Sequence, residues 1–97
     1  MPSYISLINW TDQGIRGSRE TVDRANAAKD LAQRLGGAFT SIYWTIGPYD
    51  IVTVTDFPDD ETATAFLLAV GALGNVRTTT LRAYTADEMT GIIGKLG

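Results

Sequence analysis

Apolar side chains recur along the chain with two different periods, and the period changes several times. Alternating β-branched or aromatic residues predict strands, whereas apolar residues three or four positions apart predict helices. Strand-like stretches occupy residues 4–10, 38–46, 50–57 and 76–84. Helical spacing occupies residues 18–35, 59–73 and 86–96. The predicted order is therefore βαββαβ, followed by one further helix.

Turn and capping residues mark several of the boundaries. Gly36 and Gly37 follow the first helix, where glycine readily takes the left-handed conformation of a C-terminal cap. Residues 47–49, Gly-Pro-Tyr, supply a short turn that makes the second and third strands a hairpin. Thr85 and Glu88 have the spacing of a capping box, which predicts the start of the last helix.

This order of elements predicts an α+β fold of the ferredoxin-like kind. Two crossovers and a central hairpin place four strands in one antiparallel sheet, with two helices on one face. A short C-terminal helix follows. The chain has 97 residues and no repeat or linker, so we expect residues 1–97 to form a single domain.

Alternate side chains of a strand point to opposite faces, so the strand residues divide into two sets. The more aliphatic set is expected to face the helices: Ile5, Leu7, Val52, Val54, Leu81 and Ala83. The other set mixes hydroxyls with apolar residues: Ser6, Ile8, Trp10, Ser41, Tyr43, Thr45, Ile51, Thr53, Thr55, Phe57, Thr78, Thr80, Arg82 and Tyr84. A face of that kind is too apolar for open solvent, which predicts a second sheet or a cavity against it. The alternative is a half-hydrated face rich in threonine, and a bulge in the second strand would shift Tyr43.

The second helix is apolar nearly all round. One stripe consists of Ala63, Phe66, Leu67 and Val70, and another consists of Ala65, Leu68 and Ala72. Such a helix is buried on more than one side. Either the C-terminal helix or a neighbouring subunit can cover the second stripe. A homodimer or larger assembly is therefore predicted.

Composition removes several classes of function. The net charge is −3, with no basic field to attract nucleic acid. The chain has neither cysteine nor histidine, which removes thiolate chemistry, the usual neutral-pH base and the commonest metal ligand. Glycine-rich phosphate motifs and EF-hand spacing are missing, so neither a cofactor nor a metal is expected. With no signal peptide and no membrane-spanning run, a cytoplasmic bacterial-type protein without a membrane partner is expected.

Asp50 is the best candidate for a functional carboxylate, since it stands between a turn and a β-branched run. It could act as a base, or it could orient an arginine that binds an anionic ligand. Alternatively, it accepts backbone N–H groups of the turn at residues 47–49 and locks the hairpin. Aspartate commonly has this structural role, and we favour it.

Aromatic residues and arginines complete the predicted ligand site. The tyrosines could donate hydrogen bonds to a ligand oxygen, and the other aromatic side chains could line a pocket, although each also suits packing. The arginines could bind a carboxylate bidentately or pair with an acid of the chain. The candidate ligand-binding residues are Trp10, Tyr43, Tyr49, Asp50, Arg77, Arg82 and Tyr84. No catalytic residue is assigned.

Several short motifs resemble those of the GYD-domain family in order and spacing. They are Thr11 with Gln13-Gly14, Gly36-Gly37, Gly47-x-Tyr49-Asp50, Pro58-Asp59-Asp60 and Gly74-Asn75-Val76-Arg77-Thr78. Together they cover nearly the whole chain, and Pro48 stiffens the third motif without removing a polar side chain. The resemblance implies a dimeric α+β barrel, in which two ferredoxin-like sheets pack face to face. It implies no particular reaction.

Two classes of function remain open. One is a small-molecule site between the sheets, and other dimeric α+β barrels host cofactor-free oxygenases, isomerases and decarboxylases in that way. The other is a non-catalytic assembly or accessory module, whose aromatic sheet face serves only association. Whether the protein is an enzyme, and which ligand it would take, stay open at this point.

Overall fold

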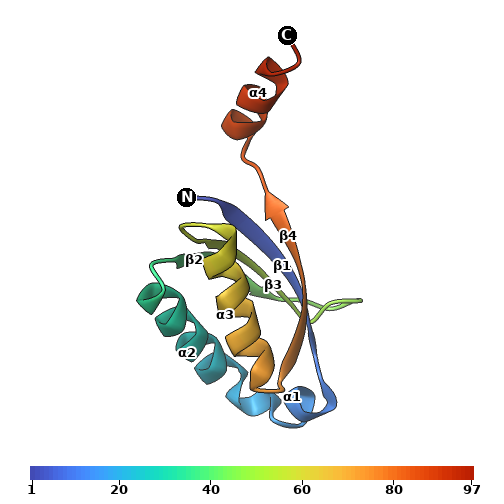
Figure 1. The fold of residues 1–97 in the computed structure, drawn as a ribbon. Coiled ribbons are helices and arrows are strands. Elements are labelled where there is room, and N and C mark those ends of the chain that lie inside the picture. The colour runs from blue at the N-terminus through green and yellow to red at the C-terminus, as the bar shows by residue number, and fades with distance from the viewer.

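Four strands form one antiparallel sheet, and two helices cover one of its faces (Figure 1). The computed structural model describes residues 1–97. The strands are β1 (Ser3–Trp10), β2 (Ala38–Trp44), β3 (Ile51–Asp56) and β4 (Val76–Ala83), in the spatial order β2-β3-β1-β4. The covering helices are α2 (Thr21–Arg34) and α3 (Asp60–Ala72). The predicted ferredoxin-like α+β fold is confirmed.

Two short helical segments, which the pattern did not predict, precede α2. Thr11 caps α1 (Asp12–Arg16) by accepting the N–H of Gly14, and the single turn η1 (Ser18–Glu20) follows. Gly17 ends α1, so the chain turns before it enters α2. The first long helix therefore begins at Thr21 rather than at Ser18, which does not cap it.

The last helix, α4 (Ala86–Gly94), stands clear of the sheet and of both covering helices (Figure 1). Its start is fixed by the predicted capping box, in which Thr85 and Glu88 bond each other's backbone N–H groups at 2.9 and 3.2 Å. Because α4 projects away, it does not cover the second apolar stripe of α3 within the chain. Leu68 of that stripe is 69% exposed. No helix has the length and apolar character needed to cross a membrane.

The strand side chains that face the helices are those of the hydroxyl-containing set, whereas the aliphatic set was predicted to do so. Ser6, Thr53 and Thr55 are buried on the helix side. The open face instead carries the aliphatic set: Ile5, Leu7, Val52, Val54, Leu81 and Ala83. The prediction was wrong because it considered hydropathy alone. The strand face that carries the hydroxyls also carries large aromatic rings, and the helices pack on these rings. The hydroxyls of Ser6 and Thr80 bond each other at 2.8 Å, which makes their burial inexpensive.

A β-bulge in β2 decides which way the second half of this strand faces. Phe39 pairs with Thr55 but Ser41 pairs with Val54, so Thr40 is an extra residue. Beyond the bulge, Tyr43 pairs with Val52 on the open face, where it is 64% exposed. The prediction that Tyr43 shares a face with the hydroxyl set is therefore wrong.

Aromatic rings form the core at one end of the layer between helices and sheet. The core cluster is Tyr4, Ala32, Phe57, Ala63 and Phe66. The ring of Phe57 is fully buried, with its centroid 5.0 Å from that of Phe66 and 6.2 Å from that of Tyr4. A Cβ atom at Gly37 would lie 2.4 Å from the Phe57 ring, so only glycine fits there. Close packing of these rings sets the distance of α3 from the sheet.

The hydroxyl of Tyr4 is part of this core and donates a hydrogen bond to Asp60 at the start of α3. Burial, reinforced by that bond, raises the pKa of Tyr4 to about 12. In the unfolded chain the group ionises near its ordinary value of 10.0. The unfolded state therefore loses its proton first, and stability falls as the pH rises through this interval.

We expect the substitution Tyr4→Phe to flatten this alkaline loss of stability. Between pH 8 and pH 11 the free energy of unfolding of the variant should fall by about 1 kcal/mol less than that of the wild type, since one pKa unit corresponds to about 1.4 kcal/mol. Denaturant titrations at both pH values measure the difference. The variant should be less stable than the wild type at pH 8, because it lacks the bond to Asp60. Equal pH dependence in the two proteins would contradict the assignment.

Candidate functional site

A cavity of about 300 Å³ lies between the sheet and the two covering helices. Short side chains line it from both sides: Ser6, Thr53 and Thr78 from the sheet and Ala25 and Ala28 from α2. These side chains cannot fill the space that the aromatic core holds open at the other end of the layer. The volume is at the lower end of the range for ligand pockets in proteins.

The walls of this cavity are mainly apolar and its charges are of one sign. Aliphatic side chains dominate the lining, among them Ile8, Leu31, Ile42, Ile51, Leu67 and Val70. Arg24 and Arg34 of α2 are the charged residues in the lining, and no carboxylate is among them. The cavity is therefore an apolar space whose charged lining residues are both arginines.

One end of the cavity carries most of its hydrogen-bonding groups. The half-buried guanidinium of Arg24 donates to the carbonyl of Gly14 at 3.0 Å. Thr21, one turn earlier on α2, accepts the indole N–H of Trp44 at 3.0 Å, which leaves its own hydroxyl proton free to donate. The ring of Trp10 also lines the cavity, and its indole N–H is buried without a hydrogen-bond partner.

The motif at residues 11–14 and the motif at residues 74–78 meet beside this end of the cavity. Thr11 donates its N–H to the carbonyl of Asn75 at 3.0 Å and its hydroxyl to that of Gly74 at 2.6 Å. Gln13 bonds the side-chain oxygen of Asn75 at 2.9 Å. A Cβ atom at Gly14 would lie 1.9 Å from the carbonyl oxygen of Asn75, so this approach requires glycine. These contacts fix α1 to the turn between α3 and β4, and through Gly14 they position Arg24.

Asp50 is bonded to backbone rather than to an arginine. Its carboxylate accepts the N–H of Trp10 at 2.9 Å, and its own N–H donates to the carbonyl of Ile8 at 2.8 Å. A structural hydrogen bond was the favoured interpretation, but its partner is the end of β1 and not the turn at residues 47–49. No ion pair joins Asp50 to Arg77 or Arg82. The only ion pair in the structure is that of Arg82 with Glu88.

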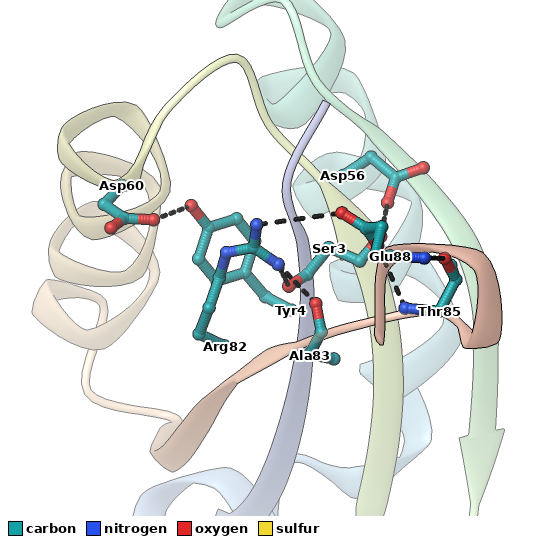
Figure 2. A network of polar contacts seen from close by, with 8 residues as sticks. All are labelled: Ser3, Tyr4, Asp56, Asp60, Arg82, Ala83, Thr85 and Glu88. Carbon is teal, nitrogen blue, oxygen red and sulfur yellow. Dashed lines mark hydrogen bonds and ion pairs between the residues drawn. The ribbon is translucent and has the colours of Figure 1, made fainter. Parts of the chain in front are cut away.

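Arg82 belongs to a separate polar network at the opposite end of the sheet (Figure 2), and Tyr84 lies beside its guanidinium. The guanidinium of Arg82 lies 4.5 Å from the ring centroid of Tyr84 and 5.8 Å from that of Tyr4, and it pairs with Glu88 at 3.9 Å. The backbone N–H of Thr85 holds the pKa of Glu88 below its usual value. Tyr4 pairs with Arg82 in the sheet, whereas Asp50 bonds Trp10 about 20 Å further along β1. The predicted residues therefore do not form one site.

The remaining candidates lie apart from the cavity. Tyr43 is on the open face, and Arg77 is exposed at the start of β4. Tyr49 is half-buried in the hairpin turn, where its carbonyl accepts the hydroxyl of Thr45 at 2.6 Å. Of the predicted ligand-binding residues, Trp10 alone lines the cavity.

Sequence reasoning missed the charged end of the cavity. Neither Arg24 nor Asn75 is among the predicted ligand-binding residues. A signal was present, because Arg24, Ala28 and Leu31 share one face of α2 at helical spacing. An arginine on the same stripe as core residues indicates a buried or half-buried cation rather than a solvated one.

Comparison with known proteins now bears on this arrangement. Residues 4–93 match the model of the GYD domain. The chain belongs to the GYD-domain family. The match extends from β1 into α4, so the family model includes the projecting helix as well as the sheet.

A named protein and a crystal structure, both from Thermus thermophilus, resemble this GYD-domain protein over most of its length. One, named glutamine synthetase and cystathionine beta-lyase binding protein, is 31% identical over 90 residues, which are 92% of this chain and 95% of the relative. The other is the crystal structure of TTHA0845, with a TM-score of 0.57 and 25% identity, covering 89% of this chain and 96% of that one. The likeness supports the fold and gives no reaction.

The Asp50 side chain can be tested with two substitutions of different acceptor capacity. Asp50→Asn keeps a side-chain oxygen for the N–H of Trp10 and should cost about 1 kcal/mol of stability. Asp50→Ala leaves that N–H unpaired and should cost about 1–3 kcal/mol. Urea unfolding at neutral pH measures both. Equal losses in the two variants would contradict the structural role of this hydrogen bond.

Proposed function

We propose that this GYD-domain protein is a homodimeric binding module, in which the open sheet faces of two copies pack against each other. The observation that carries the proposal is the aliphatic open face. Leu81, Ile5 and Val54 form one row across β4, β1 and β3, and Leu7 and Val52 continue the next row. Leu81 is 48% exposed in the single chain. Monomers seldom leave a contiguous apolar patch of this kind uncovered.

Packing of two such sheets is physically favourable. Face-to-face sheets lie about 10 Å apart, which lets aliphatic side chains from both interdigitate. Hydroxyls on this face are those of Thr79 beside Leu7, Ser41 beside Val54 and the exposed Tyr43, whereas the buried hydroxyls of Ser6 and Thr53 are on the other side of the sheet. Association therefore removes apolar area from water without burying many unpaired polar groups.

A small-molecule site between two packed sheets is the other function considered for this face. Such a site needs polar groups that converge on a cavity. Most of the hydroxyl-bearing residues expected to supply them face the helices instead, and Ser41 and Tyr43 stand on the open face beside Val54 and Val52. The aliphatic character of the face favours association over ligand binding there.

The substitution Val54→Lys tests the dimer. It places a charge in the middle of the proposed interface, where an unpaired buried charge costs about 3–5 kcal/mol. Sedimentation velocity at about 10 μM should show a wild-type dimer and a folded monomer for Val54→Lys. Val22→Lys is the matched control, because Val22 is 56% exposed on α2 and should not affect association. A monomeric wild type, or a dimer that tolerates Val54→Lys, would contradict the proposal.

The second half of the proposal concerns α4, which we assign to the recognition of a partner enzyme. The relative from Thermus thermophilus is named for binding glutamine synthetase and cystathionine beta-lyase. The match to it spans 92% of this chain, so binding of an enzyme is the function that we transfer. α4 has the features of a docking helix, since Met89, Ile92 and Ile93 of the helix and Leu96 just beyond its end recur at helical spacing and are 38–84% exposed.

The length of α4 supports a docking role. An isolated helix shorter than about 12 residues is marginal in water, so α4 needs a surface to remain folded. Apolar residues at positions i, i+3, i+4 and i+7 are the anchors with which amphipathic helices enter a hydrophobic groove. The capping box at Thr85 and Glu88 sets the helix start before any partner binds.

Charged substitutions on α4 separate partner binding from self-association. Met89→Glu and Ile93→Glu should each weaken binding of glutamine synthetase or cystathionine β-lyase from the same organism at least tenfold, because each buries a carboxylate in the groove. Thr90→Glu, which adds the same charge beside the apolar side, should bind as the wild type does. Surface plasmon resonance measures affinity, and sedimentation should show the dimer intact in all three. No binding of either enzyme by the wild type would refute this assignment.

A further inference from the structure

We propose that the cavity between the sheet and helices α2 and α3 binds a small apolar carboxylic acid, with its carboxylate at Arg24 and its hydrocarbon body between the helices. The proposal is independent of the dimer and of the role of α4. It rests on the shape of the cavity, on the chemistry of its lining and on the state of Arg24.

The body of the cavity selects an apolar ligand. Its walls come from two helices that lie side by side over the sheet (Figure 1) and are mainly aliphatic. The volume of about 300 Å³ corresponds to roughly ten non-hydrogen atoms, because a water molecule occupies about 30 Å³ in the liquid. A carboxylate with a chain of about eight carbons, or with one aromatic ring, has this size.

The charge of the cavity selects an anion. Arg24 makes one hydrogen bond, to the carbonyl of Gly14, and forms no ion pair. The side chains of Arg24 and Glu20 both lie beside Gly17, but their charged groups are too far apart to form an ion pair. A guanidinium has five N–H donors, so most of those on Arg24 are available to a ligand. A carboxylate matches their planar geometry with two parallel hydrogen bonds.

The groups around Arg24 suit the same ligand. The hydroxyl of Thr21 has a proton to donate, and Asn75 lines the cavity where the turn before β4 meets Gly14. Trp10 also lines this wall, and its indole N–H is buried behind the cavity surface without a hydrogen-bond partner. Buried donors without partners are uncommon in folded proteins, and a bound carboxylate beside Trp10 supplies an acceptor after a small rotation of the ring.

Arg34 also lines the cavity, but it is a weaker anchor for the carboxylate. It lies about 15 Å from Arg24 along α2, and its side chain is exposed to solvent. Arg24 is half-buried and held by Gly14, so it is better ordered and less hydrated. The same substitution at the two positions therefore separates a specific anion contact from a general effect of positive charge.

Octanoate is the probe, with octan-1-ol and octylammonium as its neutral and cationic counterparts. Isothermal titration calorimetry on the intact protein should show saturable binding of octanoate at least tenfold tighter than that of octan-1-ol, and no binding of octylammonium. In ¹H–¹⁵N spectra the indole resonance of Trp10 should shift on titration with octanoate. Arg24→Gln should weaken octanoate binding at least tenfold and leave octan-1-ol unchanged, whereas Arg34→Gln should alter octanoate binding less than threefold.

A second variant tests the apolar body without touching the charge. Ala28 lines the cavity and packs beside the core, so Ala28→Leu should fill part of the space and weaken both octanoate and octan-1-ol at least tenfold. The absence of saturable octanoate binding at millimolar concentration would overturn the proposal. It would also be overturned if Arg24→Gln and Arg34→Gln had equal effects, or if Ala28→Leu bound both probes as the wild type does.

Discussion

The contact of Phe57 with Phe66, whose ring centroids lie 5.0 Å apart, is the constraint on which the rest of this structure depends. It joins the end of β3 to α3 and holds the helix at the distance that two packed rings require. Tyr4 and Phe39 add their rings at the same end. Towards the other end of the layer, alanines of α2 lie opposite serine and threonine of the sheet, and these short side chains leave a cavity at that distance.

The same rings explain why the two faces of the sheet are reversed relative to their hydropathy. The total size of the side chains, rather than their average polarity, decides which face the helices cover. The hydroxyl groups on that face are acceptable because they are small and find partners, as Ser6 and Thr80 do at 2.8 Å. As a consequence, the aliphatic face is left open, and the surface best suited to association is outside the chain's own core. In this sheet the aliphatic set of strand residues therefore faces outward, and the set with the hydroxyls and large rings faces the helices.

The family motifs have mainly structural roles in this molecule. The glycines at positions 14 and 37 permit close approaches to Asn75 and Phe57, and Asp50 fixes the start of β3 to the end of β1. The residues of the first and last motifs form one hydrogen-bonded cluster that orients Arg24. The family pattern therefore defines a scaffold around the cavity rather than a set of reacting groups.

The sequence by itself determined the four strands, the helices α2, α3 and α4 and their order, because the signals for them are local. The caps formed by Asp59 and by Thr85 with Glu88 act within three residues, and periodicity acts within a few turns. It also predicted that the sheet face away from the helices is covered, and it identified Asp50 as a carboxylate with a structural role. Only the tertiary structure decided which set of side chains lies on that face, what Asp50 bonds, and which candidates come together. Alternation along a strand divides its residues into two sets but does not say which set faces inward, and the partner of Asp50 is 40 residues away. The end-to-end separation of Asp50 and Arg82, and the half-buried state of Arg24, depend on how strands and helices far apart in the sequence pack in space.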